Sequence, residues 1–155
     1  MDKNSFLIGL SESERTDFGR VDFSDQSAPQ RVFSAIWALE SQVNNGGFVQ
    51  YFGSWDGETA NFAPTALRTI GADCCAGIVE RALRAVSPGP LPESKDDRER
   101  LLESVGGAAR ARLEELDSEF FSYPDDLTEL LFAYVAARPE VFGKISDDVS
   151  NRGDG

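Results

Sequence analysis

The organisation of this chain is set by nine consecutive residues, Asn44-Asn45-Gly46-Gly47-Phe48-Val49-Gln50-Tyr51-Phe52. Before them, apolar side chains recur at three- and four-residue spacing from Val32 to Val43, which is typical of one face of a helix. Asn and Gly tolerate the left-handed conformation that ends helices, so the pattern predicts that this helix stops at 44–47. A second, short helix then carries Phe48, Tyr51, Phe52 and Trp55 on one face, and we expect that face to pack inward against the helix holding Trp37.

Helical spacing continues on both sides of this stretch, and strand-like alternation is almost absent. The sequence therefore predicts an all-α fold, a single compact domain of about seven helices. The expected helices lie near 27–43, 48–55, 61–70, 73–86, 94–105, 109–120 and 125–137. We divide the chain into an N-terminal segment at 1–26, a helical domain at 27–143 and a flexible acidic tail at 144–155.

The composition excludes several classes of function. The 155 residues include 27 Asp and Glu against 15 Lys and Arg, with no His, giving a formal net charge of -12. Direct nucleic-acid binding is not expected, because that affinity comes largely from Lys and Arg that displace counterions. Without His, the commonest general base and metal ligand is missing, and Gly106-Gly107 lacks the Lys-Ser/Thr of a phosphate-binding loop. We expect neither enzymatic activity nor a bound cofactor or metal.

Two further features bear on location and redox chemistry. The longest apolar run, 130–137, is far shorter than the roughly 20 residues that span a bilayer, and the first residues do not resemble a secretory signal. We therefore expect a cytoplasmic protein that does not enter a membrane. Cys74 and Cys75 are neighbours, too close for ordinary disulfide geometry, so both are interpreted as buried thiols.

The acidic residues are concentrated in one part of the chain. No basic residue occurs between Arg112 and Arg138, although seven acidic residues fall there. On helical spacing, the acids of 109–120 should occupy a solvated face, and those at 125–129 suit the first turn of a helix. We predict electrostatic contacts to a basic partner from Glu114, Glu115, Asp117, Glu119, Asp125 and Asp126, helped by Asp96 and Asp97. The alternative is a charged face that serves only solubility.

A different kind of site is also conceivable at the turn after the first helix. Asn45, Gln50 and Tyr51 carry polar groups close together in sequence, so a small-molecule or enzymatic site at this turn is the second hypothesis. The two hypotheses predict different structures. A binding site requires these three groups to converge on a pocket, whereas a partner surface requires exposed carboxylates.

The same turn carries a resemblance to a known family. The chain contains Glu40-Ser41-Gln42-Val43-Asn44-Asn45-Gly46-Gly47-Phe48, then Gln50-Tyr51-Phe52 and Ala66-Leu67-Arg68-Thr69-Ile70-Gly71-Ala72. Its C-terminal half contains Leu116-Asp117-Ser118-Glu119-Phe120-Phe121 and Leu130-Leu131. Over about 32–142, these motifs resemble a bacterial family of acidic, all-helical domains of unknown function that includes a DNA-mimic protein.

The resemblance carries expectations about fold and function. It implies an all-helical cytoplasmic protein that can form a homodimer, because the DNA-mimic member dimerises and occupies the DNA-binding surface of a basic transcription factor. It implies a structural role for the matched residues Asn44, Asn45, Gly46, Gly47, Phe48, Gln50, Tyr51 and Phe52. The mimicry itself would come from surface carboxylates, which no short motif specifies.

Overall fold

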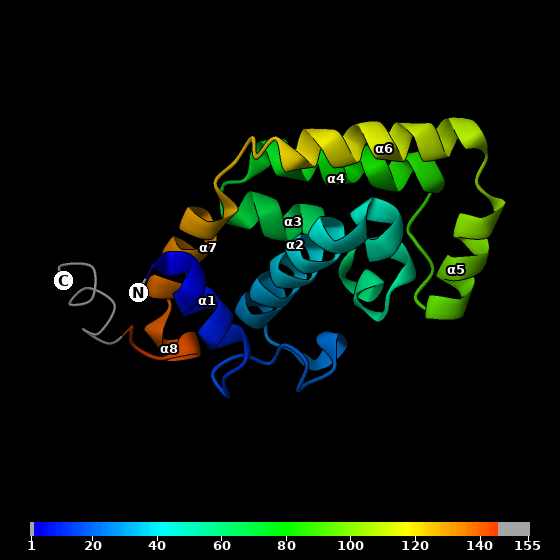
Figure 1. Ribbon diagram of the computed structural model, residues 1–155. Coiled ribbons are helices and arrows are strands. Elements are labelled where there is room, and N and C mark those ends of the chain that lie inside the picture. The colour runs from blue at the N-terminus through cyan, green and yellow to red at the C-terminus, as the bar shows by residue number, and fades with distance from the viewer. Residues whose placement is uncertain (1, 146–155) are drawn as a thin grey trace.

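A long, kinked helix, α2, runs through the middle of the molecule and contacts helices on several sides (Figure 1). The computed structural model describes residues 2–145, and within that range it contains helices and no strand. The α-helices are α1 (Lys3–Ser11), α2 (Ala28–Gly53), α3 (Ala63–Thr69), α4 (Asp73–Val86), α5 (Lys95–Ser104), α6 (Gly107–Phe121), α7 (Leu127–Ala136) and α8 (Pro139–Phe142). Two short 3₁₀ helices, η1 (Phe23–Asp25) and η2 (Trp55–Thr59), flank α2. The predicted all-α class is confirmed.

The kink in α2 lies where the sequence predicts a helix stop. Gly46 (φ -164°, ψ 21°) and Gly47 (φ 79°, ψ -173°) leave helical geometry, but the chain resumes the helix at once. The two helices expected at 27–43 and 48–55 are therefore two halves of α2. A positive φ is readily available only to glycine, so Gly47 turns the chain without ending the helix.

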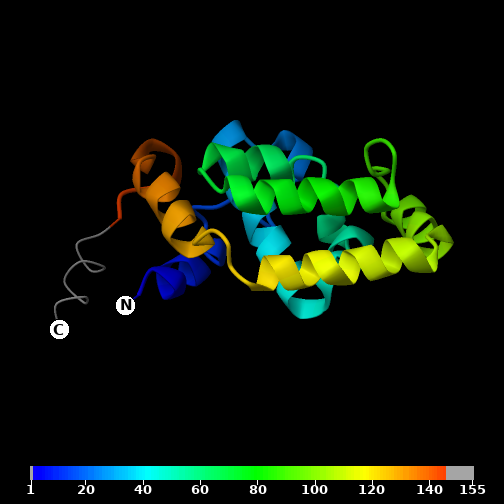
Figure 2. The same ribbon diagram turned by 90° about the horizontal axis from the view of Figure 1, so that it is seen from above.

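The helices form two layers with a cap at each end. The antiparallel pair α4 and α6 lies over α2 and α3, as two perpendicular views show (Figures 1 and 2). At one end α1 packs on α7 and α7 on α8, whereas α5 packs on α2 and η2 at the other. The core between the layers is lined by buried side chains of both halves of α2, including Phe33, Leu39, Phe48 and Phe52.

The aromatic face predicted for 48–55 is only partly correct. Phe48, Tyr51 and Phe52 are fully buried, but Trp55 is 77% exposed. The reason is local, because α2 ends at Gly53 and the extended residue Ser54 turns the chain into η2. Trp55 therefore leaves the helical stripe that the spacing predicts.

The N-terminal end of the chain differs from the expected organisation. Helix α1 occurs inside the expected N-terminal segment, and its Leu7 and Leu10 are buried in the common core. The expected flexible tail at 144–155 falls, except for its first two residues, outside the described part of the chain. No helix within residues 2–145 combines the length and apolarity needed to cross a membrane.

Candidate functional site

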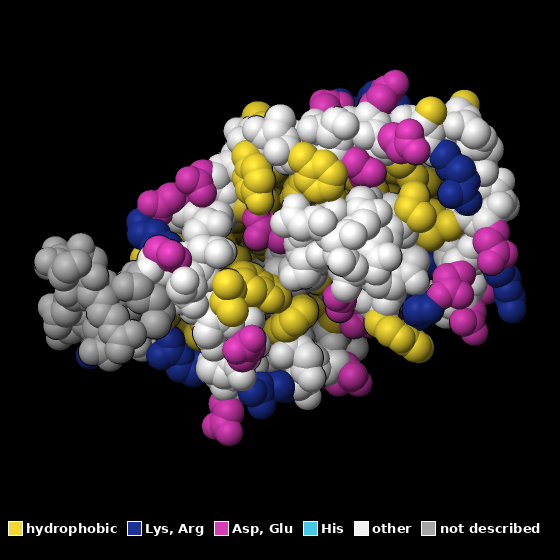
Figure 3. All heavy atoms as spheres, in the orientation of Figure 1, with side chains coloured by type: hydrophobic (Ala, Val, Ile, Leu, Met, Phe, Trp, Pro, Cys, Tyr) yellow, Lys and Arg dark blue, Asp and Glu magenta, His cyan; other side chains and the backbone are white. Residues whose placement is uncertain are grey.

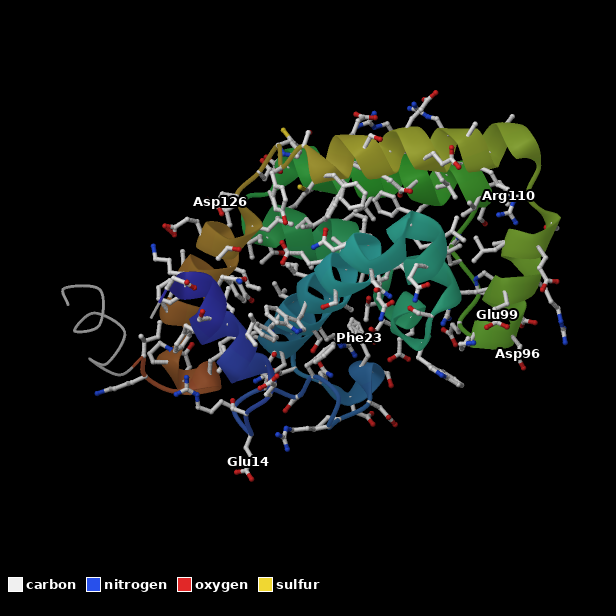
Figure 4. The ribbon with its side chains drawn as sticks, in the orientation of Figure 1. Glu14, Phe23, Asp96, Glu99, Arg110 and Asp126 are labelled. Atoms are coloured by element: carbon white, nitrogen blue, oxygen red, sulfur yellow. The ribbon has the colours of Figure 1, made fainter. Side chains whose placement is uncertain are left out.

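The carboxylates predicted to contact a partner are spread along three consecutive helices. Helices α5, α6 and α7 follow one another along the length of the molecule (Figure 2). Asp96 near one end and Asp126 near the other lie far apart (Figure 4). The predicted contacts therefore form an extended series of positions along the molecule rather than one compact patch.

The acidic residues on α6 have basic neighbours that the sequence does not reveal. Glu114 and Glu115 are exposed, and Glu115 Oε2 lies 2.9 Å from Arg112 Nη1, three residues earlier. Glu119 Oε1 lies 3.1 Å from Nη2 of Arg81, which comes from the adjacent helix α4. Both ion pairs are at the surface, where such pairs contribute about 0–1 kcal/mol. The acidic stretch after Arg112 is thus partly neutralised in space, although it lacks basic residues in sequence.

Asp117 does not belong to the solvated face on which the sequence places it. Its side chain is half-buried, and its Oδ1 accepts a 2.8 Å hydrogen bond from the backbone N–H of Phe48, just after the kink in α2. Burial raises the pKa of Asp117, while this hydrogen bond opposes the rise. The prediction of Asp117 as a solvent-facing contact is therefore wrong, because its carboxylate satisfies an amide that the kink leaves without an intrahelical partner.

Asp125 and Asp126 both cap helices, but different ones. Asp126 Oδ1 accepts a 3.1 Å bond from the N–H of Glu129 and caps α7, as its place in the sequence suggests. Asp125 Oδ2 instead accepts a 2.8 Å bond from the N–H of Cys75, in the first turn of α4. Asp126 remains exposed, whereas Asp125 is half-buried by this contact. The expectation that Asp125 serves the first turn of its own helix is corrected accordingly.

Asp96 and Asp97 lie in the first turn of α5 and are both exposed. Ser94 caps this helix by accepting a 3.1 Å bond from the N–H of Asp97. Asp97 Oδ1 is 3.5 Å from Arg100 Nη1 in an exposed pair. Four of the predicted contact residues are therefore exposed, and among the described residues their carboxylates neither cap a helix nor make a buried hydrogen bond. We call these four residues the exposed contact set: Asp96, Asp97, Glu114 and Glu115.

The alternative site at the turn is not assembled. Tyr51 is fully buried, and its hydroxyl lies 2.6 Å from Thr59 Oγ1 inside the core. Burial raises its pKa above the ordinary tyrosine value. Asn45 and Gln50 are exposed instead, and Gln50 Nε2 donates a 3.1 Å bond to Gln42 Oε1. The three polar groups thus point to different environments.

The segment that contains the kink contributes no charged side chain to the surface. No charged residue occurs between Glu40 and Asp56, and the centre of the face in Figure 3 is accordingly neutral, with carboxylates around its edge. A shallow hollow of about 470 Å³ lies there between the kink, Trp55 and Lys95. Lys95 Nζ lies 5.3 Å from the centre of the Trp55 ring and also pairs with Glu99. Asn44, Asn45, Gly46 and Gln50 are exposed here, whereas Gly47, Phe48, Tyr51 and Phe52 are buried.

Sequence reasoning misses a second group of carboxylates, which the fold brings together near η1 and η2. Asp22, Asp56 and Glu58 line a hollow of about 250 Å³. Phe23, the first residue of η1, also borders this hollow (Figure 4). Burial first, and then the neighbouring Asp56 and Asp22, raise the pKa of Glu58, and Arg98 opposes this. Only the tertiary fold could reveal this group, because Asp22 is more than thirty residues away from Asp56 and Glu58 in the sequence.

One carboxyl group has a strongly altered acidity. Glu40, on α2, is half-buried, and burial raises its pKa to about 7. The nearby charge of Asp126 adds to the rise. Glu40 therefore changes charge near neutral pH, unlike an ordinary surface glutamate.

Comparison with known proteins identifies one relationship. A family model described as DMP19-like protein matches residues 24–138, which is most of the chain and includes α2 to α7. Searches of curated proteins and of solved structures each gave no match. The match includes every residue of the exposed contact set and the kink of α2.

Proposed function

This chain belongs to the DMP19-like protein family, and from that premise we propose that it is a non-enzymatic, acidic protein-interaction domain that acts as a DNA mimic. In this proposal it occupies the DNA-binding surface of a basic protein such as a transcription factor. The observation that carries the proposal is the placement of exposed carboxylates along α5, α6 and the start of α7. The resemblance found in the sequence supports the same role.

The dimensions of α6 are compatible with part of a DNA strand. Its 15 residues span about 22 Å at a rise of about 1.5 Å per residue. In B-DNA, one strand rises about 3.4 Å per nucleotide, so this length corresponds to about six phosphates. The exposed acids of α6 are fewer than that, and they would match selected phosphates only. Carboxylates of α5 and α7 extend the series beyond both ends of α6.

Net charge supplies the second part of the argument. A chain with a formal charge of -12 attracts a basic surface over distances of about one Debye length, roughly 8–10 Å at physiological salt. Such attraction raises association rates and weakens as salt is added. The proposed complex should therefore form most readily at low ionic strength.

The test is displacement from DNA. Proteins of the source cell are bound to DNA-cellulose at low salt, and the column is washed with the purified full chain. We expect a specific basic protein to elute. That protein, once purified, should lose its DNA shift in an electrophoretic assay when the chain is added. An eluted protein that binds the chain and DNA simultaneously would contradict mimicry.

Two variants that lose the same number of charges distinguish binding through a specific acidic surface from attraction by the net negative charge alone. The first neutralises the exposed contact set as Asp96→Asn, Asp97→Asn, Glu114→Gln and Glu115→Gln. The control neutralises four other exposed acids, as Glu12→Gln, Glu14→Gln, Asp25→Asn and Glu140→Gln. Both variants lose four negative charges, so equal loss of displacement would indicate that the acidity acts only as bulk charge. Mimicry predicts a clearly larger loss for the first variant.

A further inference from the structure

The junction between α6 and α7 presents two aromatic rings to solvent, and an exposed acidic residue follows them in the sequence. Phe121 is 45% exposed and Tyr123 is 56% exposed. Apolar side chains are visible on the surface where α6 ends (Figure 3). Asp126 follows three residues after Tyr123 and is exposed. We call Phe121, Tyr123 and Asp126 the aromatic corner.

Tyr123 occupies a backbone conformation that does not suit tyrosine. Its φ is 53°, and it is the one non-glycine residue within 2–145 with a positive φ. This left-handed geometry at a helix end is the usual place of glycine or asparagine. The N–H of Tyr123 donates a 3.1 Å bond to Phe120 O, so the geometry closes the last turn of α6. Glycine could make the same bond, so the turn alone does not explain why a residue with an exposed phenol ring occupies this position.

The electrostatic surroundings of the aromatic corner favour a cation. Helix α6 ends here, and the carbonyl end of a helix carries a partial negative charge. The last turn of α6 contains no basic residue that could complement it. Asp126 adds a full negative charge at the start of α7. Two basic residues from neighbouring helices are already paired with other acids: Arg81 of α4 with Glu119, and Lys3 of α1 with Glu129.

We propose that the aromatic corner binds an arginine side chain of the basic partner, with the guanidinium lying on the Tyr123 ring and paired with the Asp126 carboxylate. The proposal rests on the proposed function and adds where, and through which residue type, the partner is held. The negative charge at the aromatic corner attracts any cation, and the exposed rings favour a cation that can stack on them. A guanidinium is planar and weakly hydrated, so it stacks on an aromatic ring while its edge donates to a carboxylate. A lysine ammonium would gain the charge attraction but less of the stacking.

The direct test uses the full chain and two synthetic peptides of equal length and charge. Both alternate glycine with a cation, which is arginine in one peptide and lysine in the other. With the ¹⁵N-labelled chain, we expect the arginine peptide to shift amide signals of 121–126 and to bind about three- to tenfold more tightly than the lysine peptide. Equal affinities, or shifts centred on another acidic surface, would overturn the proposal.

Two variants test the named groups without threatening the fold. Tyr123→Gly removes the ring and suits the positive φ, so it should fold at least as well as the natural chain. It should abolish the preference for arginine over lysine. Asp126→Asn keeps a good helix cap and removes the charge, so it should weaken both peptides. Trp55→Ala, which removes an exposed ring elsewhere, is the matched control and should change neither affinity.

The same variants separate this inference from the proposed function. If the displacement experiment yields no DNA-binding protein, yet Tyr123→Gly removes the arginine preference, the aromatic corner stands and the mimic proposal fails. If a displaced protein binds Tyr123→Gly as tightly as the natural chain, the aromatic corner is overturned while mimicry stands.

Discussion

A buried arginine holds the C-terminal end of α2, and replacing it should destabilise the whole domain. Arg98 is only 1% exposed. Its Nε donates to Phe52 O at 2.9 Å and its Nη2 to Ser54 O at 2.9 Å, at the end of α2. Its Nη1 donates to Pro92 O at 3.2 Å and to Glu93 O at 2.5 Å, in the loop before α5. The guanidinium thus ties α5 and its preceding loop to the last carbonyls of α2.

The cost of the change Arg98→Met follows from these partners. A buried acceptor left without a donor costs about 1–3 kcal/mol. Phe52 is buried and Ser54 is half-buried, so their carbonyls have little access to replacement water, whereas that of the exposed Glu93 can be rehydrated. Burial lowers the pKa of Arg98, because loss of water disfavours its charge, and a Met side chain carries no such desolvation cost. The loss of the hydrogen bonds to Phe52 O and Ser54 O, reduced by the desolvation cost that Met avoids, gives a net destabilisation of about 3 kcal/mol.

Equilibrium unfolding in urea, followed by far-UV circular dichroism, measures this loss. With a urea dependence of about 1–3 kcal/mol per molar, the midpoint should fall by about 1–3 M while the slope stays constant. Arg84→Met, at an exposed position on α4, is the matched control and should change stability by less than about 0.5 kcal/mol. A midpoint for Arg98→Met as close to the natural value as that of the control would refute the reasoning.

Three further predictions concern the kink, a buried acid and the thiols. Gly47→Ala should destabilise by about 2–4 kcal/mol, because φ is +79° and the new β-carbon would meet the carboxylate of Asp117. In an Asp117→Ala background the cost should be smaller, and strictly additive values in a double-mutant cycle would contradict the contact. Burial raises the pKa of Glu40 from 4.5 to about 7, so the folded chain keeps a proton that the unfolded chain has lost, and stability should fall as pH rises through this window. Glu40→Gln should therefore stabilise by about 3 kcal/mol at about pH 8 but little at about pH 4, and urea midpoints that differ equally at both pH values would contradict this. The expectation that both thiols are buried is wrong for Cys74, which is exposed. Burial raises the pKa of the Cys75 thiol to about 12, so a thiol reagent should modify Cys74 quickly in the native chain and both cysteines in urea.

Helix positions could be predicted from the sequence because apolar spacing reports which face of a segment is buried. That rule correctly identifies Phe48, Tyr51 and Phe52 of α2 as buried. It fails at Trp55, since spacing assumes that a helix continues and cannot see that Ser54 turns the chain. It also cannot distinguish a glycine pair that ends a helix from one that bends it. That outcome depends on Asp117, which is distant in sequence and meets the freed amide of Phe48.

The candidate site was less predictable, because a carboxylate's role depends on what lies beside it in space. Glu119 looks unpaired in sequence, yet Arg81 reaches it from α4. Asp125 looks like a cap for the helix that follows it, yet it caps α4. The acidic hollow with Asp22, Asp56 and Glu58 has no sequence signal at all. Charge counts therefore predicted the acidic character of the chain but not the division between structural and exposed carboxylates.

That division changes how the family match bears on function. Asp117 and Gly47 form one structural contact, in which an acid supports a glycine kink, and both lie in motifs that carry the family resemblance. A family model that matches such residues is evidence first of all for the packing of α2 against α6. Under the proposed function, partner choice depends on residues with no role in this packing, such as Glu114 and the ring of Tyr123. We then expect members that share the kink and differ at these exposed positions to share the fold and bind different basic proteins.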